Sequence, residues 1–401
     1  MKKWLILYGA MIMTTEAYSL ETNAIPWDEI KKAEKIIIKF GTRALVKENK
    51  DFDEDLFQKL GEDIKKLLEM QKKIVIVSSG AVNAGVKRLQ LPSRPKELLY
   101  QQMLAAIGNP LLMNQYQKYL PVPVAQVLVT QEDLSNRTAY VNIRNTLRLM
   151  LKENIIPIIN ENDVVSINEL YSEEGMEYNF SDNDLLSALI ASMIKADLLI
   201  IFSDIEGLYT KHPNSKFKEF VPYVAEINGE IRKMAKSGSN MGRGGMISKI
   251  MAAEIANESG INVFLTHAKK TRLIEIFEPK VLGTFFKRKE VPIKNRHSWL
   301  IHAGIVRGSI VVDEGAKNAI VEGKSLLMPG IIDFKGSFNK DDIVAIEFNG
   351  TQVAKGKINF SCDELTRFKD MKEEERKEYF KKYGIREIIS NENIGFLRYE
   401  L

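Results

Sequence analysis

The chain has 401 residues, of which 45% are hydrophobic and 27% are charged, a composition typical of folded proteins rather than of disordered or collagen-like chains. Its 57 Lys and Arg residues against 53 Asp and Glu residues give a formal net charge of +4, too small over this length to indicate nucleic-acid binding by charge alone. The single cysteine, Cys362, excludes an internal disulfide framework and a zinc site built from several cysteines.

The first residues resemble a secretion signal. Two lysines precede an apolar stretch at residues 4–13, and small residues follow at 17–19, as in a cleavable signal peptide. An apolar stretch this short cannot cross a bilayer. Because the rest of the chain is typical of a nucleotide enzyme, we interpret residues 1–30 as an extension with Met11 or Met13 as the working start, and we expect a cytoplasmic protein.

From residue 31 to residue 285, short apolar runs alternate with longer helical patterns. This alternation is typical of βαβ units around a mainly parallel sheet, and uninterrupted apolar runs indicate strands that are covered on both faces. We predict strands at 36–40, 74–78, 124–129, 155–159, 198–202 and 261–266. We predict helices at 52–70, 96–119, 138–153, 184–195 and 245–259. The sequence therefore favours an α/β catalytic domain over residues 31–285.

The pattern changes near residues 279–297, where a basic stretch with proline suits a linker better than a strand or a helix. We place the linker at 286–300. Short, alternating, glycine-punctuated segments then predict a small β-barrel or sandwich in a second domain, 301–401. These segments lie at 309–312, 331–334, 343–348 and 352–358, and a charged helix is predicted at 369–383.

Ligands of doubly wound sheets bind beyond the carboxyl ends of the strands. The first predicted strand ends with Lys39 near a glycine turn, and a lysine there suits phosphate oxygens, although a lysine that snorkels to solvent is the simpler reading. After the second strand, Ser79 and two glycines lead into a helix whose N-terminus favours an anion. An ordinary serine cap would look similar.

Three further polar segments follow predicted strands. Residues 160–163 and 181–184 could hold an ammonium group, organise lysines or order a magnesium ion, but helix capping by Ser181 or Asp182 also explains the second segment. Ser203 and Asp204 could hold a nucleotide base or ribose, or could simply form a turn.

The segment at 238–249, GSNMGRGGMISK, is glycine-rich and runs into a predicted helix. Backbone amides of such a loop can surround phosphates while Lys249 supplies charge to a transferred phosphoryl group. The chain has no Walker A sequence, and no G-x-G-x-x-G follows the first strand. Two lysines from separate segments with a carboxylate between them favour phosphoryl transfer, in which catalysis is mostly positioning and charge neutralisation.

The order of these motifs resembles the amino acid kinase family, in the branch that carries a C-terminal PUA domain. The resemblance covers the chain from about Asp28, and its PUA-like part lies at about 309–360. It rests on the segments IKFGT, IVIVSSGAVNAG, PIINENDVV, SDNDLLSAL, SDIEGLYT and GRGGMISK. The resemblance implies a three-layer αβα sandwich with a mainly parallel sheet, followed by a small β-rich PUA domain.

The resemblance also implies a reaction. ATP would phosphorylate the side-chain carboxylate of L-glutamate to L-glutamyl 5-phosphate, the first step of proline biosynthesis, with Mg²⁺ as a cofactor. Since that carboxylate is already ionised at neutral pH, no general base is needed. A homo-oligomer, dimer or tetramer, and inhibition by proline are implied as well.

Two kinds of alternative stay open. Other members of the family phosphorylate aspartate, acetylglutamate or a nucleoside monophosphate. The chain could also be an inactive RNA-binding PUA protein, although mixed local charge without a basic stripe argues against RNA as a partner. We expect no membrane partner.

The resemblance assigns roles to individual residues. Lys39 and Lys249 would stabilise charge on the phosphoryl group, and Asp184 would hold both lysines in position. Glutamate would bind to Ser79, Asp163, Asn183 and, as a weaker candidate, Asn160. ATP would contact Lys39, Ser203, Asp204, Arg243, Gly244, Gly245, Met246, Ile247, Ser248 and Lys249. No metal ligand is assigned.

Three residues depart from the pattern of the family. Arg243 and Ser248 stand where threonine is common, and Ser248 keeps the hydroxyl group. His212 replaces an acidic residue, which concerns the nucleotide side of the site. The N-terminal extension has no counterpart in the resemblance.

Overall fold

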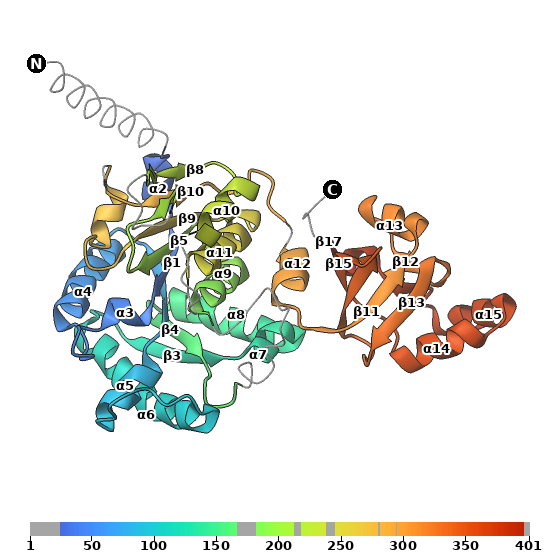
Figure 1. Ribbon diagram of the computed structural model, residues 1–401, viewed down its shortest axis with the longest axis horizontal. Helices are drawn as coiled ribbons and strands as arrows, with labels where there is room; N and C mark the ends of the chain where they lie inside the picture. The colour runs from blue at the N-terminus through green and yellow to red at the C-terminus, as the bar shows by residue number, and fades with distance from the viewer. Residues whose placement is uncertain are drawn as a thin grey trace, which may run out of the picture. The chain divides into compact units, whose positions relative to one another are not determined.

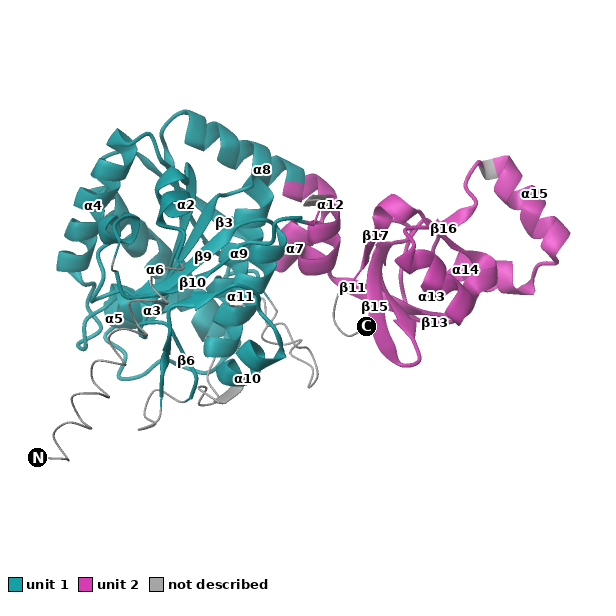
Figure 2. Ribbon diagram, turned by 90° about the horizontal axis from the view of Figure 1, so that it is seen from above, with its two compact units in different colours: residues 1–130, 141–292 teal, residues 131–140, 293–401 magenta. Residues whose placement is uncertain are grey.

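The computed structural model describes residues 25–166, 182–211, 218–237, 245–279, 281–293 and 295–396 (Figure 1). Residues 1–24 of the predicted extension lie outside the described residues, as do Ser181, His212, Arg243 and Gly244. The chain divides into two compact units (Figure 2). Unit 1 comprises Met1–Thr130 and Val141–Pro292, and unit 2 comprises Gln131–Tyr140 and Ile293–Leu401.

Unit 1 is built on an eight-stranded sheet. Its strands are β1 (Lys35–Phe40), β2 (Lys73–Ser78), β3 (Val124–Val129), β4 (Ile156–Glu161), β5 (Leu198–Ser203), β8 (Tyr223–Val224), β9 (Asn262–His267) and β10 (Thr284–Phe286). Their order in space is β3-β4-β2-β1-β5-β9-β10-β8. Only β9 and β10 pair antiparallel within this sheet. The mainly parallel sheet is therefore confirmed.

Helices cover this sheet, and a small hairpin adjoins it. The helical segments of unit 1 are α2 (Trp27–Lys32), α3 (Thr42–Leu45), α4 (Glu54–Glu69), α5 (Ala81–Arg88), α6 (Leu98–Tyr119), the part of α8 (Arg137–Lys152) from Val141 on, α9 (Asn183–Ile194), α10 (Gly229–Ser237), α11 (Met246–Glu258) and η1 (Ile274–Phe277). The hairpin pairs β6 (Leu208–Tyr209) with β7 (Phe220–Val221). All six predicted strands and all five predicted helices of this region are present, with ends shifted by at most two residues.

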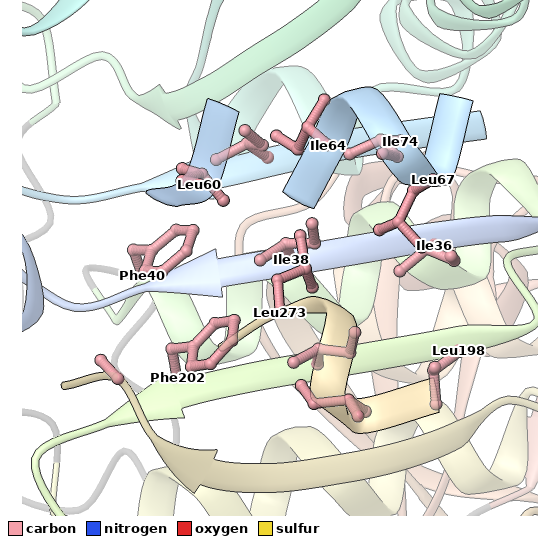
Figure 3. Packing of buried hydrophobic residues seen from close by; sticks show 14 of the residues in the cluster. Ile36, Ile38, Phe40, Leu60, Ile64, Leu67, Ile74, Leu198, Phe202 and Leu273 are labelled. Carbon is pink, nitrogen blue, oxygen red and sulfur yellow. The ribbon is translucent and has the colours of Figure 1, made fainter. Parts of the chain in front are cut away.

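The two faces of β1 have different neighbours. Ile36, Ile38 and Phe40 leave the strand on one face and pack in a buried cluster with residues of α4 (Figure 3). Because side chains alternate along a strand, Lys39 leaves on the opposite face. Helix α9 lies beside β1 and packs against α11, so the lysine faces the layer that these two helices form.

Helix α9 is buried along its length, from Asp184 to Ile194. A helix that is apolar all round belongs in the interior, and α9 lies between the sheet and α11. The carboxylate of Asp182 caps it by accepting a hydrogen bond from the backbone N–H of Asp184 at 2.9 Å. The capping alternative raised for this segment is thus confirmed for Asp182, and the cap fixes Asp184 in the first turn.

Unit 2 contains a five-stranded sheet. Its strands are β11 (Val306–Val312), β13 (Ile331–Gly336), β14 (Ile343–Phe348), β15 (Thr351–Lys357) and β17 (Ile394–Phe396), in the order β13-β11-β14-β15-β17. A separate pair joins β12 (Leu326–Leu327) to β16 (Glu387–Ile389). The four strands predicted here are all present.

The helical segments of unit 2 are short. They are α7 (Gln131–Ser135), α12 (Asn295–Ser298), η2 (Trp299–Ala303), α13 (Glu314–Val321), η3 (Met328–Gly330), α14 (Cys362–Asp370), α15 (Glu373–Tyr383) and η4 (Asn391–Asn393). Among the helices in the described part of the chain, none combines the length and apolar character that crossing a bilayer requires.

Two predictions about secondary structure are wrong. The single charged helix at 369–383 is two helices, α14 and α15, because Met371 is extended and packs against the core of unit 2. The basic stretch 287–297 is predicted to form neither strand nor helix, but α12 begins within it, and the strand β10, which no prediction includes, directly precedes it. Phe285 and Phe286 of β10 are buried and pair with β9. A strand of only three residues is too short to give a periodic pattern of apolar residues in the sequence.

Candidate active site

Three charged side chains from three elements meet beside the carboxyl end of β1. Nζ of Lys39 lies 2.6 Å from Oδ1 of Asp184 in α9, and Nζ of Lys249 in α11 lies 3.0 Å from Oδ2. Asp184 is 0% exposed and each lysine is 5% exposed. The structure therefore brings together the two lysines and the carboxylate that the sequence placed in separate segments.

The first turn of α11 contributes a second contact to Asp184. The hydroxyl of Ser248 lies 3.2 Å from Oδ2 of Asp184 and 2.9 Å from the backbone oxygen of Gly245. Met246, Ile247, Ser248 and Lys249 are helical, as the predicted helix at 245–259 requires, so these four residues of the segment 238–249 do not belong to a loop. Gly245 is the N-cap of this helix. The helix rather than a loop sets the direction in which Lys249 points.

The charges in this cluster stabilise one another. Burial by itself raises the pKa of Asp184, but the ammonium groups of Lys39 and Lys249 outweigh burial and hold it at about 2. Burial alone would lower the pKa of Lys249, but Asp184 raises it above its usual range. Burial and the neighbouring Asp184 raise the pKa of Asp182. The cluster thus holds two ammonium groups around the ionised carboxylate of Asp184, with the carboxyl group of Asp182 beside them.

We expect Asp184 to make stability sensitive to acid. Its pKa falls from 3.8 to about 2 on folding, so the stabilisation is present above about pH 4 and is lost as the pH falls through about 2. The shift corresponds to roughly 2 kcal/mol. Urea unfolding of the parent and of Asp184→Asn should give a difference in unfolding free energy that is constant above about pH 5 and shrinks below about pH 4. A difference in unfolding free energy that stays the same at every pH would contradict the expected contribution of Asp184 to stability.

A group of uncharged polar side chains adjoins the charged cluster, because Asn183 directly precedes Asp184. Nδ2 of Asn183 donates to Oγ of Ser79 at 2.7 Å and to Oδ1 of Asn160 at 3.0 Å. Ser79 lies in the turn between β2 and α5, and Asn160 lies in β4. Three of the four residues predicted to bind the substrate are therefore in direct contact. Asp163 is half-buried in the turn after β4.

A third group lies at the ends of β1 and β5. Ser203 ends β5, and its hydroxyl donates to Oδ1 of Asp204 at 3.2 Å. Oδ2 of Asp204 accepts from Nη1 of Arg43, which follows β1, at 2.9 Å. Burial raises the pKa of Asp204, but the hydrogen bonds from Arg43, the backbone and Ser203, together with the charge of Arg43, outweigh burial and lower the pKa. Sequence analysis missed Arg43, although its place just after a strand-end glycine was a usable signal.

Sequence analysis also missed a polar group at the ends of β5 and β9. His267 ends β9 and lies opposite Ser203 in the register of the two strands. Burial, followed by Lys270, lowers the pKa of His267. Glu206 accepts hydrogen bonds from Lys270 and from the hydroxyl of Tyr209, each at 2.6 Å. His267 directly follows a predicted strand, so the strand-end rule could have found it.

Comparison with known proteins gives matches along most of the chain. Residues 34–267 match the model of the amino acid kinase family, and residues 308–380 match the model of the PUA domain. A protein named Glutamate 5-kinase from Thermoanaerobacter sp. (strain X514) is 37% identical over 371 residues, covering 90% of this chain and 98% of the relative. A protein of the same name from Methanococcoides burtonii is 36% identical over 376 residues, covering 92% and 98%.

A solved structure, carbamate kinase from Giardia lamblia bound to AMP-PNP, is 13% identical to this chain. The match covers 65% of this chain and 100% of the carbamate kinase chain, with a TM-score of 0.46. A similarity at this level supports no conclusion about function.

Proposed function

Because the chain belongs to the amino acid kinase family, we propose that it is a glutamate 5-kinase with a C-terminal PUA domain. It transfers the γ-phosphoryl group of ATP to the side-chain carboxylate of L-glutamate and forms L-glutamyl 5-phosphate, the first step of proline biosynthesis. Beyond sequence similarity, one observation carries the proposal. Lys39 and Lys249 converge on the buried carboxylate of Asp184, an arrangement suited to a phosphoryl group in transfer.

The two lysines act on charge that develops during the reaction. The transferred phosphoryl group spreads negative charge over three equatorial oxygens. Ammonium groups fixed in a site that excludes water stabilise that charge more strongly than solvent does. Asp184 keeps both ammonium groups in place before ATP binds, so the cluster needs little rearrangement during the reaction.

Ser79, Asn160, Asn183 and Asp163 form the glutamate side of the site in this proposal. They orient the substrate so that one oxygen of its side-chain carboxylate forms a bond to the γ-phosphorus. The bond from that phosphorus to the oxygen that bridges it to the β-phosphorus breaks, and ADP leaves with the electron pair. The carboxylate enters ionised, so no residue has to remove a proton.

Ser203, Asp204 and residues 243–249 form the nucleotide side. Among the described residues, no group of three or more His, Cys, Asp or Glu side chains is placed to hold a metal ion, and both oxygens of Asp184 face ammonium groups. Mg²⁺ would accompany the phosphates of ATP in this proposal, and no side chain of this protein is assigned to hold it. It would neutralise phosphate charge together with Lys39 and Lys249.

Further properties belong to the same proposal. The enzyme works in the cytoplasm as a homo-oligomer, and proline inhibits it. The catalytic domain spans residues 31–285, the linker 286–300 and the PUA domain 301–401. The PUA domain has a structural or regulatory role rather than RNA as a partner.

A coupled assay of ADP release with hydroxylamine tests the proposed reaction. Hydroxylamine captures an acyl phosphate as a hydroxamate, which a phosphate ester cannot form. We expect ADP and γ-glutamyl hydroxamate to appear in equal amounts with L-glutamate, and little product with aspartate, acetylglutamate or UMP. Faster turnover of any of these three would identify a different member of the family, and no turnover with any of the four would overturn the proposed function.

Asn183→Ala is expected to raise the KM for glutamate roughly 10- to 150-fold with a smaller change in kcat. The amide of Asn183 organises Ser79 and Asn160, and the loss of hydrogen bonds to a charged substrate costs about 1.5–3 kcal/mol. The helix cap is retained because Asp182 supplies it. Initial rates over a range of glutamate concentrations measure the effect, and the KM for ATP in the same variant is the control. An unchanged KM for glutamate would remove Asn183 from the substrate site.

A further inference from the structure

A buried chain of hydrogen bonds runs from α6 to the turn that carries Ser79. The hydroxyl of Tyr116 donates to Oγ of Ser78 at 2.8 Å, and the hydroxyl of Ser78 donates to the backbone oxygen of Ser79 at 3.1 Å. Tyr116 and Ser78 are both 0% exposed. The polar contacts already described for the site do not include either residue.

Two hydrogen bonds fix the orientation of the peptides on either side of Ser79. The backbone N–H of Ser79 is held by the oxygen of Phe40 at 3.1 Å, and the Ser78 hydroxyl holds the oxygen of Ser79. In a trans peptide the next N–H points in the opposite direction, so the N–H of Gly80 is oriented as well. Gly80 has φ +114°, a region in which glycine is unrestrained, so sterics alone do not set this peptide.

The hydroxyl of Tyr116 has no evident role in packing. The ring of Tyr116 meets Phe57 edge-to-face at 5.1 Å between ring centroids and lies in an apolar cluster. A phenylalanine would fill the same space without burying a polar group, which costs about 1–3 kcal/mol when it is unpaired. Burial raises the pKa of Tyr116, so the phenol stays protonated and remains a donor.

Helix α6 is a firm support for this contact because it touches α5 at the backbone. A Cβ on Gly108 of α6 would lie 1.8 Å from the backbone oxygen of Ala81, and a Cβ on Gly85 of α5 would lie 2.1 Å from that of Leu104. Neither glycine can be replaced without moving a helix. The separation between α6 and the N-terminus of α5, where Ser79 and Gly80 lie, is therefore set by direct contact.

We propose that Tyr116 is a positioning residue for the glutamate site. It acts through Ser78 to hold the Ser79–Gly80 peptide, and with it the Ser79 side chain that Asn183 contacts, in the orientation that binds the substrate. The inference rests on the proposed function, which makes Ser79 a glutamate contact. It adds a residue that does not itself touch substrate.

Tyr116→Phe tests the inference. We expect the KM for glutamate to rise about 3- to 10-fold, the range that loss of one intramolecular hydrogen bond gives, while kcat and the KM for ATP change less than about 2-fold. Tyr119→Phe is the matched control, because Tyr119 lies on the same helix and its ring also packs on Phe57, at 6.2 Å. Its glutamate KM should equal that of the parent.

A double-mutant cycle with Ser78→Ala distinguishes positioning of the glutamate site through Ser78 from a general loss of stability in the protein. Because both residues act through one chain of contacts, Tyr116→Phe combined with Ser78→Ala should raise the KM for glutamate no more than the larger single change does. If Tyr116→Phe does not fold, Ser78→Ala alone should show the same selective rise.

The outcomes distinguish this inference from the function on which it rests. A parent enzyme that forms no γ-glutamyl hydroxamate would overturn the proposed function and the inference with it. An active parent combined with an unchanged glutamate KM in Tyr116→Phe, or with changes that add fully in the double variant, would overturn the inference alone.

Discussion

Lys249→Met is expected to lower kcat about 1,000-fold, because one of two fixed cations around the transferred phosphoryl group is lost. The protein should stay folded. Asp184 keeps Lys39 as a partner at 2.6 Å, so no buried carboxylate is left unpaired, and methionine retains an unbranched apolar side chain in the first turn of α11. Steady-state rates and urea unfolding of the same preparation measure the two effects separately.

A second lysine near the same helix provides the control for this variant. Lys289 pairs with Glu258 at the other end of α11, at 3.4 Å, and Lys289→Met should keep the kcat of the parent. A Lys249→Met enzyme with kcat within about 10-fold of the parent would remove Lys249 from the catalytic centre, because the loss of a transition-state cation costs far more than that.

Asp184→Asn is expected to damage both activity and stability. It removes the buried carboxylate that both Lys39 and Lys249 contact, and breaking a buried ion pair in this way costs about 3–5 kcal/mol. Turnover should fall by about 1,000-fold or more, because the lysines lose the group that holds them. Urea unfolding and initial rates at neutral pH measure the two losses.

Combining Lys249→Met with Asp184→Asn tests whether repulsion between the two ammonium groups causes the loss of stability in Asp184→Asn. In the Asp184→Asn variant, Lys39 and Lys249 have lost the carboxylate that they share. The double variant removes one of these two ammonium groups, so it should recover part of the lost stability and none of the lost activity. If Asp184→Asn proves as stable as the parent, or if the second change costs further stability, Asp184 does not hold the lysines by charge.

Much of the site could be predicted from the sequence because parallel strands place their carboxyl ends along one edge of a sheet. Continuous apolar runs marked the strands, and the polar residues just beyond them included Ser79, Asn160 and Ser203. This rule depends only on local pattern and on the direction of the strands. It located the edge of the sheet where the described site residues gather.

Contacts between elements could not be predicted in this way. The position of Lys249 over Asp184 depends on how α11 packs against α9, and the predicted helix at 245–259 contains this lysine without indicating which residues its side chain meets. Tyr116 lies on an apolar helix, where its spacing indicates core packing rather than a polar contact. The short strand β10 and the break between α14 and α15 depend on tertiary burial of a few side chains, which leaves no periodic signal.

The central claim is that the phosphoryl group held by Lys39 and Lys249 passes to the side-chain carboxylate of glutamate rather than to water. Glutamate labelled with ¹⁸O in that carboxylate tests this claim when it is incubated with the enzyme, ATP and hydroxylamine. Hydroxylamine attacks the acyl carbon, so the phosphate released from the acyl phosphate should carry one labelled oxygen in an amount equal to the hydroxamate. Phosphate without label, formed at the same rate as ADP, would show that the group passes to water and would contradict the account.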